Sequence, residues 1–142
     1  MDKIVLMNAS EWEKYANEAH LLSFSVDRPS SFDRTNFAIM YVHDEVPYSF
    51  MSCHEMDEET CYIQWGGSFK PEEKKVFAMR AYVKMLGFLC EKYKRLTTSI
   101  ENTNTEMLKP AMKAGFRIVG VRVGAGKVFL EHVLELGVQY GR

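Results

Sequence analysis

The residues from Tyr62 to Lys75 carry the pattern that best suits binding of a phosphate group. They predict a strand, a turn at Gly66-Gly67, and a helix whose first position is Pro71. The glycines are expected to end the strand, because glycine adopts positive φ without steric cost. A helix that follows a tight turn presents unpaired backbone N–H groups to an anion. Strand–turn–helix is also how any α/β domain is built, so the pattern alone leaves both interpretations open.

A few other residues have the chemistry of an acid or a base. Glu101 closes a predicted strand and can serve as a general base, although a solvated strand end is the commoner role of such a glutamate. His54 and Glu55 precede a predicted hairpin turn and can reach an amine, or can simply be surface residues. The histidines and cysteines show no spacing typical of a metal site, so none is expected; they are His20, His43, His54 and His132, and Cys53, Cys61 and Cys90.

Length and composition indicate one globular domain over residues 1–142. Apolar residues make up 46% of the chain and the formal net charge is −1, so no global field would draw it to nucleic acid or to an anionic membrane. The sequence has no apolar run of membrane-spanning length and no export signal. These features predict a cytoplasmic protein with reduced thiols.

The elements that would position these residues form a sheet covered on both sides. Residues 36–43 are apolar on both faces of a predicted strand, which requires helices on each face. Short loops join this strand to strands at 48–56 and 61–69, which predicts an antiparallel meander. A long helix over 72–93 then leads to a strand at 96–101, expected to run parallel to the 61–69 strand. The other predicted elements are a strand at 4–6, a helix at 11–20 with a capping box from Ser10 to Glu13, a short helix or loop at 31–36, a helix at 106–114 ended by Gly115, and strands at 116–123 and 127–136.

A family resemblance appears in the second half of the chain. Asn104, followed by residues 107–113, Gly115-Phe116 and Gly120, resembles the N-x-x-A…Y-x-K-x-G-F…G signature of the GNAT N-acetyltransferase superfamily. The order of predicted elements is similar over nearly the whole chain. Trp65-Gly-Gly and Ile100-Glu-Asn-x-Asn also resemble small GNAT-like proteins of tailed bacteriophages. The resemblance implies an α/β (α+β) fold of three αβα layers, with a mixed sheet of six or seven strands. It further implies a location in the host cytoplasm or in the virion.

The resemblance also implies a chemistry, in which an amine attacks the thioester of acetyl-CoA. The pantetheine arm would pair with the strand that ends near Trp65, and the pyrophosphate would lie at the start of the following helix. The implied cofactor-binding residues are Gln64, Trp65, Gly66, Lys74, Lys75, Val76 and Asn104, and the candidate catalytic residues are Glu101 and Tyr62. The implied partners are a CoA thioester and an amine acceptor, without nucleic acid, membrane or metal, and a homodimer is left open.

The chain departs from the family pattern at two points. Phe77 and Met79 stand where the phosphate loop should have glycine or another small residue, and a side chain there would keep the pyrophosphate from the backbone. Ala111 replaces the tyrosine that would protonate the thiolate, a role open to Tyr62, Tyr82, Tyr93 or water. Two hypotheses follow, an acetyl-CoA-dependent N-acyltransferase and a catalytically inactive GNAT-fold protein with a binding or virion-associated role.

Overall fold

The computed structural model describes residues 1–25, 34–69 and 74–136, and the side chains of residues 74–77 are outside that description. The elements are β1 Asp2–Asn8, α1 Ala9–Phe24, β2 Phe37–His43, β3 Val46–Glu55, β4 Thr60–Ser68, α2 Lys74–Lys92, β5 Arg95–Glu101, α3 Thr105–Ala114, β6 Arg117–Gly124 and β7 Lys127–Glu135. Their order matches the prediction. The short helix or loop predicted at 31–36 lies partly outside the described residues, and residues 34–36 are not helical. No helix in the described ranges is long and apolar enough to cross a membrane.

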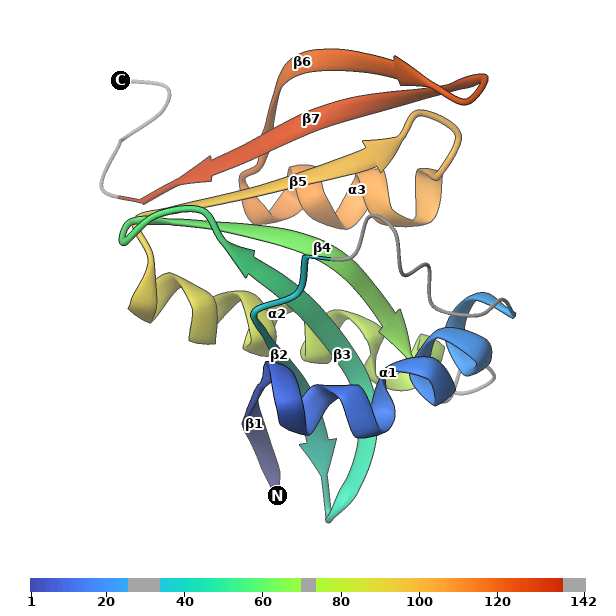
Figure 1. Cartoon of the computed structure of the whole chain (residues 1–142), viewed down its shortest axis with the longest axis vertical. Coiled ribbons are helices and arrows are strands. Elements are labelled where there is room, and N and C mark those ends of the chain that lie inside the picture. Colours follow the sequence, from blue (N-terminus) through green and yellow to red (C-terminus); the bar gives the residue numbers. More distant parts are fainter. Residues whose placement is uncertain (26–33, 70–73, 137–142) are drawn as a thin grey trace.

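The strands form one mixed sheet of seven, in the order β1-β2-β3-β4-β5-β7-β6 (Figure 1). Among the strands that the structure describes, only β4 and β5 pair in parallel, through the crossover helix α2, as the long helix between them predicted. β2 to β4 form the expected antiparallel meander, and β1 pairs antiparallel with β2 on its other edge. The last two strands exchange places, because β7 inserts between β5 and β6. This arrangement confirms the predicted α+β fold with a mixed central sheet.

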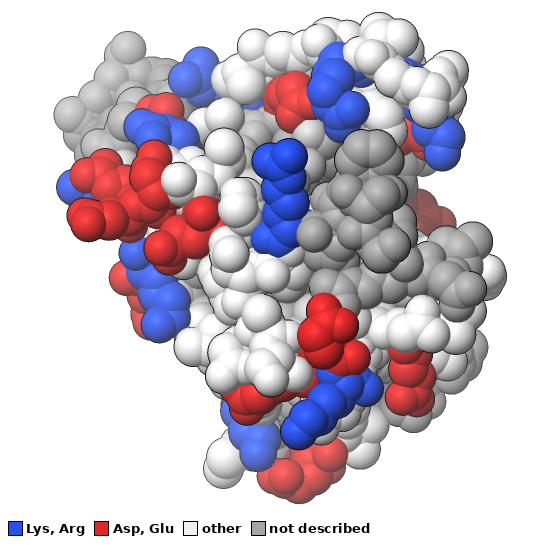
Figure 2. Space-filling model, viewed as in Figure 1, with Lys and Arg blue, Asp and Glu red and all other residues white. Residues whose placement is uncertain are grey.

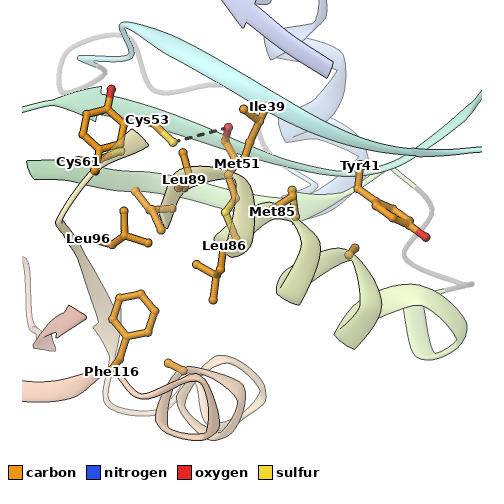
Figure 3. Close-up of a cluster of buried hydrophobic side chains, with 14 of the residues drawn as sticks. Ile39, Tyr41, Met51, Cys53, Cys61, Met85, Leu86, Leu89, Leu96 and Phe116 are labelled. Carbon is orange, nitrogen blue, oxygen red and sulfur yellow. Dashed lines mark hydrogen bonds between the residues drawn. The ribbon is translucent and has the colours of Figure 1, made fainter. Parts of the chain in front are cut away.

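The two faces of the sheet carry separate cores. Ile39 and Tyr41 of β2 point into the larger cluster, where Figure 3 shows side chains of several strands converging on α2. That cluster also contains Ala111 and Phe116, so α2 and α3 cover the same face. Ala38 of β2 points the other way and packs in a smaller cluster beneath α1. The prediction that both faces of this strand are covered is therefore confirmed.

Helix ends were predicted with mixed success. The capping box of α1 uses Asn8 and Glu11, not Ser10 and Glu13. Asn8 Oδ1 accepts from the Glu11 N–H at 2.8 Å, and the Glu11 carboxylate accepts from the Asn8 N–H at 3.0 Å. The box lies earlier because β1 runs up to Asn8 and the chain turns at once into the helix. At the end of α3, Gly115 has φ +104°, the left-handed conformation predicted for a C-cap.

Candidate functional site

The parallel pairing between β4 and β5 stops in the middle of the sheet. Thr60–Ile63 pairs with Arg95–Thr98, yet β4 continues to Ser68 and β5 to Glu101. At the last pair the Thr98 hydroxyl donates a hydrogen bond of 2.9 Å to the Ile63 carbonyl. Beyond this point, no strand among the described residues pairs with the edge of β4 that faces β5, a feature we call the ladder break. Unpaired backbone groups along a strand edge can bind an extended ligand as an added strand.

A β-bulge at Gln64 sets the direction of the side chains beside the ladder break. Cys53 pairs with Ile63 and Ser52 pairs with Trp65, so Gln64 is an extra residue between two pairs. The Ile63 side chain packs in the larger cluster against α2, called the α2 core below, whereas the Trp65 side chain packs in the smaller cluster beneath α1. Regular alternation along a strand would place Ile63 and Trp65 on one face, but one extra residue inverts every later side chain.

Gln64 and Trp65 therefore have positioning roles in the structure. The Gln64 Oε1 accepts a hydrogen bond of 3.1 Å from the backbone N–H of Arg34, which ties the segment before β2 to the bulge. The Trp65 ring lies 5.3 Å from His20 and 6.1 Å from Phe24 of α1, measured between centroids. Its indole Nε1 is buried and has no hydrogen-bond partner among the described residues. Trp65 is thus part of the packing that fixes α1 against β4.

The two glycines of β4 do not end the strand, contrary to the prediction. Gly66 pairs with Met51 and Gly67 with Phe50, and neither has a positive φ. A Cβ on Gly67 would lie 2.1 Å from Ser23 Oγ, so close contact with α1 requires this glycine. A Cβ on Gly66 would meet only Met51 and the Phe50 carbonyl oxygen, both at 3.8 Å, an ordinary contact. Packing therefore accounts for Gly67 but not for Gly66.

A row of hydrogen-bonded side chains begins beside the ladder break, on the face opposite the α2 core. The Tyr62 hydroxyl of β4 donates to Ser99 Oγ of β5 at 3.4 Å, and Ser99 donates to Glu131 Oε2 of β7 at 2.5 Å. Arg122 Nε of β6 then donates to Glu131 Oε1 at 3.1 Å, with its guanidinium 4.4 Å from the Phe129 ring centroid. We call Tyr62, Ser99, Glu131 and Arg122 the cross-strand row.

Glu101, the predicted general base, lies on the same face at the end of β5. Its carboxylate accepts a hydrogen bond of 3.0 Å from the Thr103 hydroxyl and lies 3.8 Å from Lys127 Nζ. These contacts hold it at the start of β7. Tyr62, the other predicted catalytic residue, is instead hydrogen-bonded to Ser99, at the first β5 position beyond the last β4–β5 pair.

The remaining predicted residues lie around the two helices that follow the break. Lys74, Lys75 and Val76 form the start of α2, and their side chains, like that of Phe77, lie outside the described residues. Asn104 is exposed before α3, where its N–H donates to the Glu101 carbonyl at 2.9 Å. Met79 is half exposed on α2. Ala111 is fully buried and has no group that can donate a proton.

The candidate substitutes for the missing tyrosine differ in their environments. Burial raises the pKa of Tyr82 to about 12. Burial, and a 2.5 Å hydrogen bond from its hydroxyl to Glu55, also raise the pKa of Tyr93. Both phenols therefore stay protonated at neutral pH.

Within the described ranges, no three His, Cys, Asp or Glu side chains are grouped so as to hold a metal ion. Figure 2 shows acidic and basic residues interspersed on the face in view.

Ser99, Glu131 and Arg122 were not predicted as functional residues. Glu131 does stand out in the sequence as a carboxylate between Leu130 and His132 in a largely apolar strand. Its neighbours depend on β7 lying between β5 and β6, which places it beside Ser99 and across from Gly120. Local sequence contains no signal for that exchange of strand order.

No protein-family model and no curated protein sequence matches the chain. Several solved structures do. The ribosomal-protein-S18-alanine N-acetyltransferase of Escherichia coli matches with a TM-score of 0.76 at 11% identity, over 99% of this chain and 97% of that one. A GNAT family acetyltransferase from Elizabethkingia anophelis with acetyl-CoA bound matches with a TM-score of 0.64 at 17% identity, over 95% and 98%. Arabidopsis thaliana NAA60 in complex with a bisubstrate analogue matches with a TM-score of 0.66 at 14% identity, over 96% and 99%. The chain therefore has the fold of the GNAT acetyltransferases.

Proposed function

We propose that residues 1–142 form a single acyltransferase domain that transfers an acetyl group from acetyl-CoA to a primary amine. The ladder break carries this proposal, because it leaves an unpaired strand edge inside the sheet at the residues where the GNAT resemblance expects the pantetheine arm. Similar folds have been solved with acetyl-CoA bound, including a Campylobacter jejuni N-acetyltransferase matched over 72% of this chain. In the proposal, Gln64, Trp65 and Gly66 supply backbone groups to the amides of the pantetheine arm.

The start of α2 completes the donor site in this proposal. It follows β4 in the chain, and a helix N-terminus offers unpaired N–H groups and a positive dipole end to a pyrophosphate. Lys74 and Lys75 add two positive charges there, next to Val76. Asn104 stands at the start of α3. Gly66 fits the same interpretation, since packing does not require a glycine there and a side chain would add bulk beside the open edge.

The reaction forms one C–N bond and breaks one C–S bond. The amine nitrogen attacks the thioester carbonyl, the amine gives up a proton, and CoA leaves as a thiolate. A thiolate is a good leaving group and does not require a proton donor. The buried Ala111, which stands in place of the proton-donating tyrosine, therefore does not prevent the reaction. A proton acceptor for the amine is needed, and Tyr62 and Glu101 are the candidates carried from the sequence. Tyr62 is the better placed, because its hydrogen-bond partner Ser99 lies at the ladder break.

Calorimetric titration of the purified protein with acetyl-CoA tests the proposal, together with amide hydrogen exchange. Saturable binding and slower exchange of the amides of residues 64–66 are expected, with β1 and β2 unchanged. Gly66→Val should weaken binding at least tenfold in a variant that circular dichroism shows to be folded. Its matched control is Gly87→Ala, at a helical position where a Cβ meets nothing within 4 Å.

Absence of binding by the folded wild-type protein at millimolar acetyl-CoA would overturn the proposal. That outcome would favour the alternative of a GNAT-fold protein without catalysis. Binding that Gly66→Val leaves unaffected would place the ligand away from the ladder break, and would equally count against the site proposed here.

A further inference from the structure

We infer that Glu131 is the final acceptor of the proton released by the amine, which reaches it through Tyr62 and Ser99. This inference rests on the proposed function and adds roles for Ser99 and Glu131, which were not predicted as functional residues. The supporting observation is the cross-strand row, which joins the edge of the ladder break on β4 to a carboxylate on β7 through two hydroxyl groups.

The chemistry of the residues in the cross-strand row fixes the direction in which each hydroxyl group donates its proton. An ionised carboxylate can only accept hydrogen bonds, so at 2.5 Å the Ser99 hydroxyl must donate its single proton to Glu131. Ser99 Oγ can then only accept from Tyr62, whose phenol is 3.4 Å away. Both hydroxyl protons therefore point toward Glu131. The Tyr62 oxygen keeps its lone pairs for a proton that arrives from the other side.

The row begins where a reacting amine would lie. Thr98 makes the last β4–β5 pair, and Ser99 is the next residue, pointing away from the α2 core because its neighbour Ile100 points into it. Tyr62 lies between Cys61 and Ile63, which both face that core, so its phenol lies on the same face as Ser99. The two hydroxyl groups thus meet at the edge of the ladder break.

The proton transfer balances in one concerted step. The amine proton passes to the Tyr62 oxygen as the phenol proton passes to Ser99 Oγ and the Ser99 proton passes to Glu131 Oε2. The C–N bond forms, the C–S bond breaks, and the electron pair of the C–S bond leaves on the thiolate. Both hydroxyl groups end neutral, and the negative charge of Glu131 is exchanged for that of the thiolate. No further reactant is needed.

Arg122 acts as a positioning residue for Glu131. Its Nε holds the Oε1 of the carboxylate at 3.1 Å, which leaves Oε2 turned to Ser99. The Arg122 side chain is itself placed over the ring of Phe129. The Glu131 side chain is about one-third exposed (32%), so the proton can pass to solvent after each turnover.

The experiment measures acetyl transfer from acetyl-CoA to two probe amines, benzylamine and a peptide with a free α-amino group, by release of the CoA thiol. Glu131→Gln should lower kcat by about 100-fold, the low end of general-base effects, with the Kd for acetyl-CoA and the melting temperature unchanged. Ser99→Ala and Tyr62→Phe should show the same pattern, and Ser99→Thr should restore most of the rate because it restores the hydroxyl. The matched control is Glu135→Gln, on the same strand and face, which breaks an equivalent ion pair with Arg95 at 3.2 Å and should leave kcat unchanged.

A second measurement needs no bound ligand. The Ser99 hydroxyl proton, which bridges Ser99 Oγ and Glu131 Oε2 at an oxygen–oxygen distance of 2.5 Å, should exchange slowly enough for observation by NMR. Glu131→Ala should abolish its signal, whereas Glu135→Gln should not. Unchanged kcat in Glu131→Gln, in an enzyme that binds acetyl-CoA and acetylates either probe, would overturn the inference and leave the proposed function standing. A 100-fold loss of kcat in Glu101→Gln, with kcat unchanged in Glu131→Gln, would also overturn the inference and would assign the role of proton acceptor to Glu101. Failure of the wild type to bind acetyl-CoA would overturn the proposed function, and the inference with it.

Discussion

Ser23 and Gly67 are in such close contact that a Cβ on Gly67 would lie 2.1 Å from Ser23 Oγ and 2.8 Å from Ser23 Cβ. The same serine accepts a hydrogen bond of 3.0 Å from the Ser68 N–H. The end of α1 is thus fixed to the last residues of β4. This contact places the end of α1 close to the ladder break, because Gly67 lies only a few residues beyond Gln64 on β4.

Gly67→Ala should therefore destabilise the protein by about 1–3 kcal/mol, the usual cost of adding bulk to a packed contact. Gly66→Ala is the matched control and should change stability by less than about 0.5 kcal/mol, since a methyl group there meets its neighbours only at 3.8 Å. Urea denaturation of the two variants measures the difference. Equal stabilities would show that α1 moves aside at no cost.

Charge at the start of α2 is predicted to govern donor binding. Replacing both Lys74 and Lys75 by glutamate should weaken binding of acetyl-CoA at least tenfold, because each charge-assisted contact to phosphate contributes about 1.5–3 kcal/mol. Raising the salt concentration should weaken binding by the wild type as well. Calorimetry with acetyl-CoA and with pantetheine, which lacks the pyrophosphate, separates the contributions. A loss of pantetheine binding in the double variant would contradict the assignment.

Phe77 and Met79 are predicted to limit the affinity for the donor. They stand where the resemblance expects small residues. Replacing both by glycine should therefore strengthen acetyl-CoA binding, provided that the double variant remains folded. Glycine also costs about 1 kcal/mol at each helical position, and circular dichroism must therefore confirm that α2 is retained. Unchanged or weaker affinity in a folded double variant would show that these side chains do not obstruct the pyrophosphate.

Acid should destabilise the protein through Asp2. A hydrogen bond from His43, at 2.5 Å, lowers the pKa of the Asp2 carboxyl below its usual value of 3.8, and the neighbouring Tyr41 hydroxyl and the charge of Arg80 lower this pKa further. A carboxyl whose pKa is lower in the folded state stabilises the protein above its unfolded pKa, and this stabilisation is lost as the pH falls through the folded pKa. Asp2→Asn should thus lower the melting temperature at pH 7, and the difference from the wild type should shrink as the pH falls below 3.8.

Glu45→Gln is the control for that prediction. Its partner is Lys3 at 3.4 Å and its side chain is 85% exposed, so water screens the pair and little stability should depend on it. Melting curves of the wild type and both variants between pH 2 and pH 7 make the comparison. A pH-independent difference for Asp2→Asn would mean that packing rather than ionisation is responsible.

The thiols of Cys53 and Cys61 should be inert in the native protein. Both are fully buried, and burial raises the pKa of Cys53 well above the ordinary thiol value of 9.0, with a further contribution from the neighbouring Cys61 thiol. Dithiobis(nitrobenzoate) at pH 8 should modify Cys90 first, since only this cysteine is partly exposed. All three should react in urea. Fast modification of either remaining thiol in native Cys90→Ser would contradict the burial of the pair.

Local patterns predicted the fold well because the features that decide it are local. A long helix was predicted over 72–93, and a helix of that length between two strands requires a crossover, which predicted the parallel pair β4–β5. Gly115 was predicted as a C-cap because few other residues adopt its φ of +104°.

The candidate site was predicted less completely because register and strand order decide it. The bulge at Gln64 turns Trp65 to the opposite face, and no property of Gln64 itself announces a bulge. Gly67 is explained by contact with Ser23, which is distant in sequence. Glu131 meets Ser99 only because β7, the last strand in the chain, inserts beside β5. Each of these is a relationship between segments far apart in the sequence.

The ladder break gives the sheet an edge in its interior. Edges at the rim of a sheet can pair with a second molecule, whose own free edge then pairs with a third, and this is how native sheets begin to aggregate. The outer half of β4 is enclosed between β3 on one side and the continuing β5 on the other. A strand edge in that position can pair with one extended segment, and that segment then has no free edge to which another strand could add. The protein thereby presents unpaired strand backbone without the risk of open-ended growth.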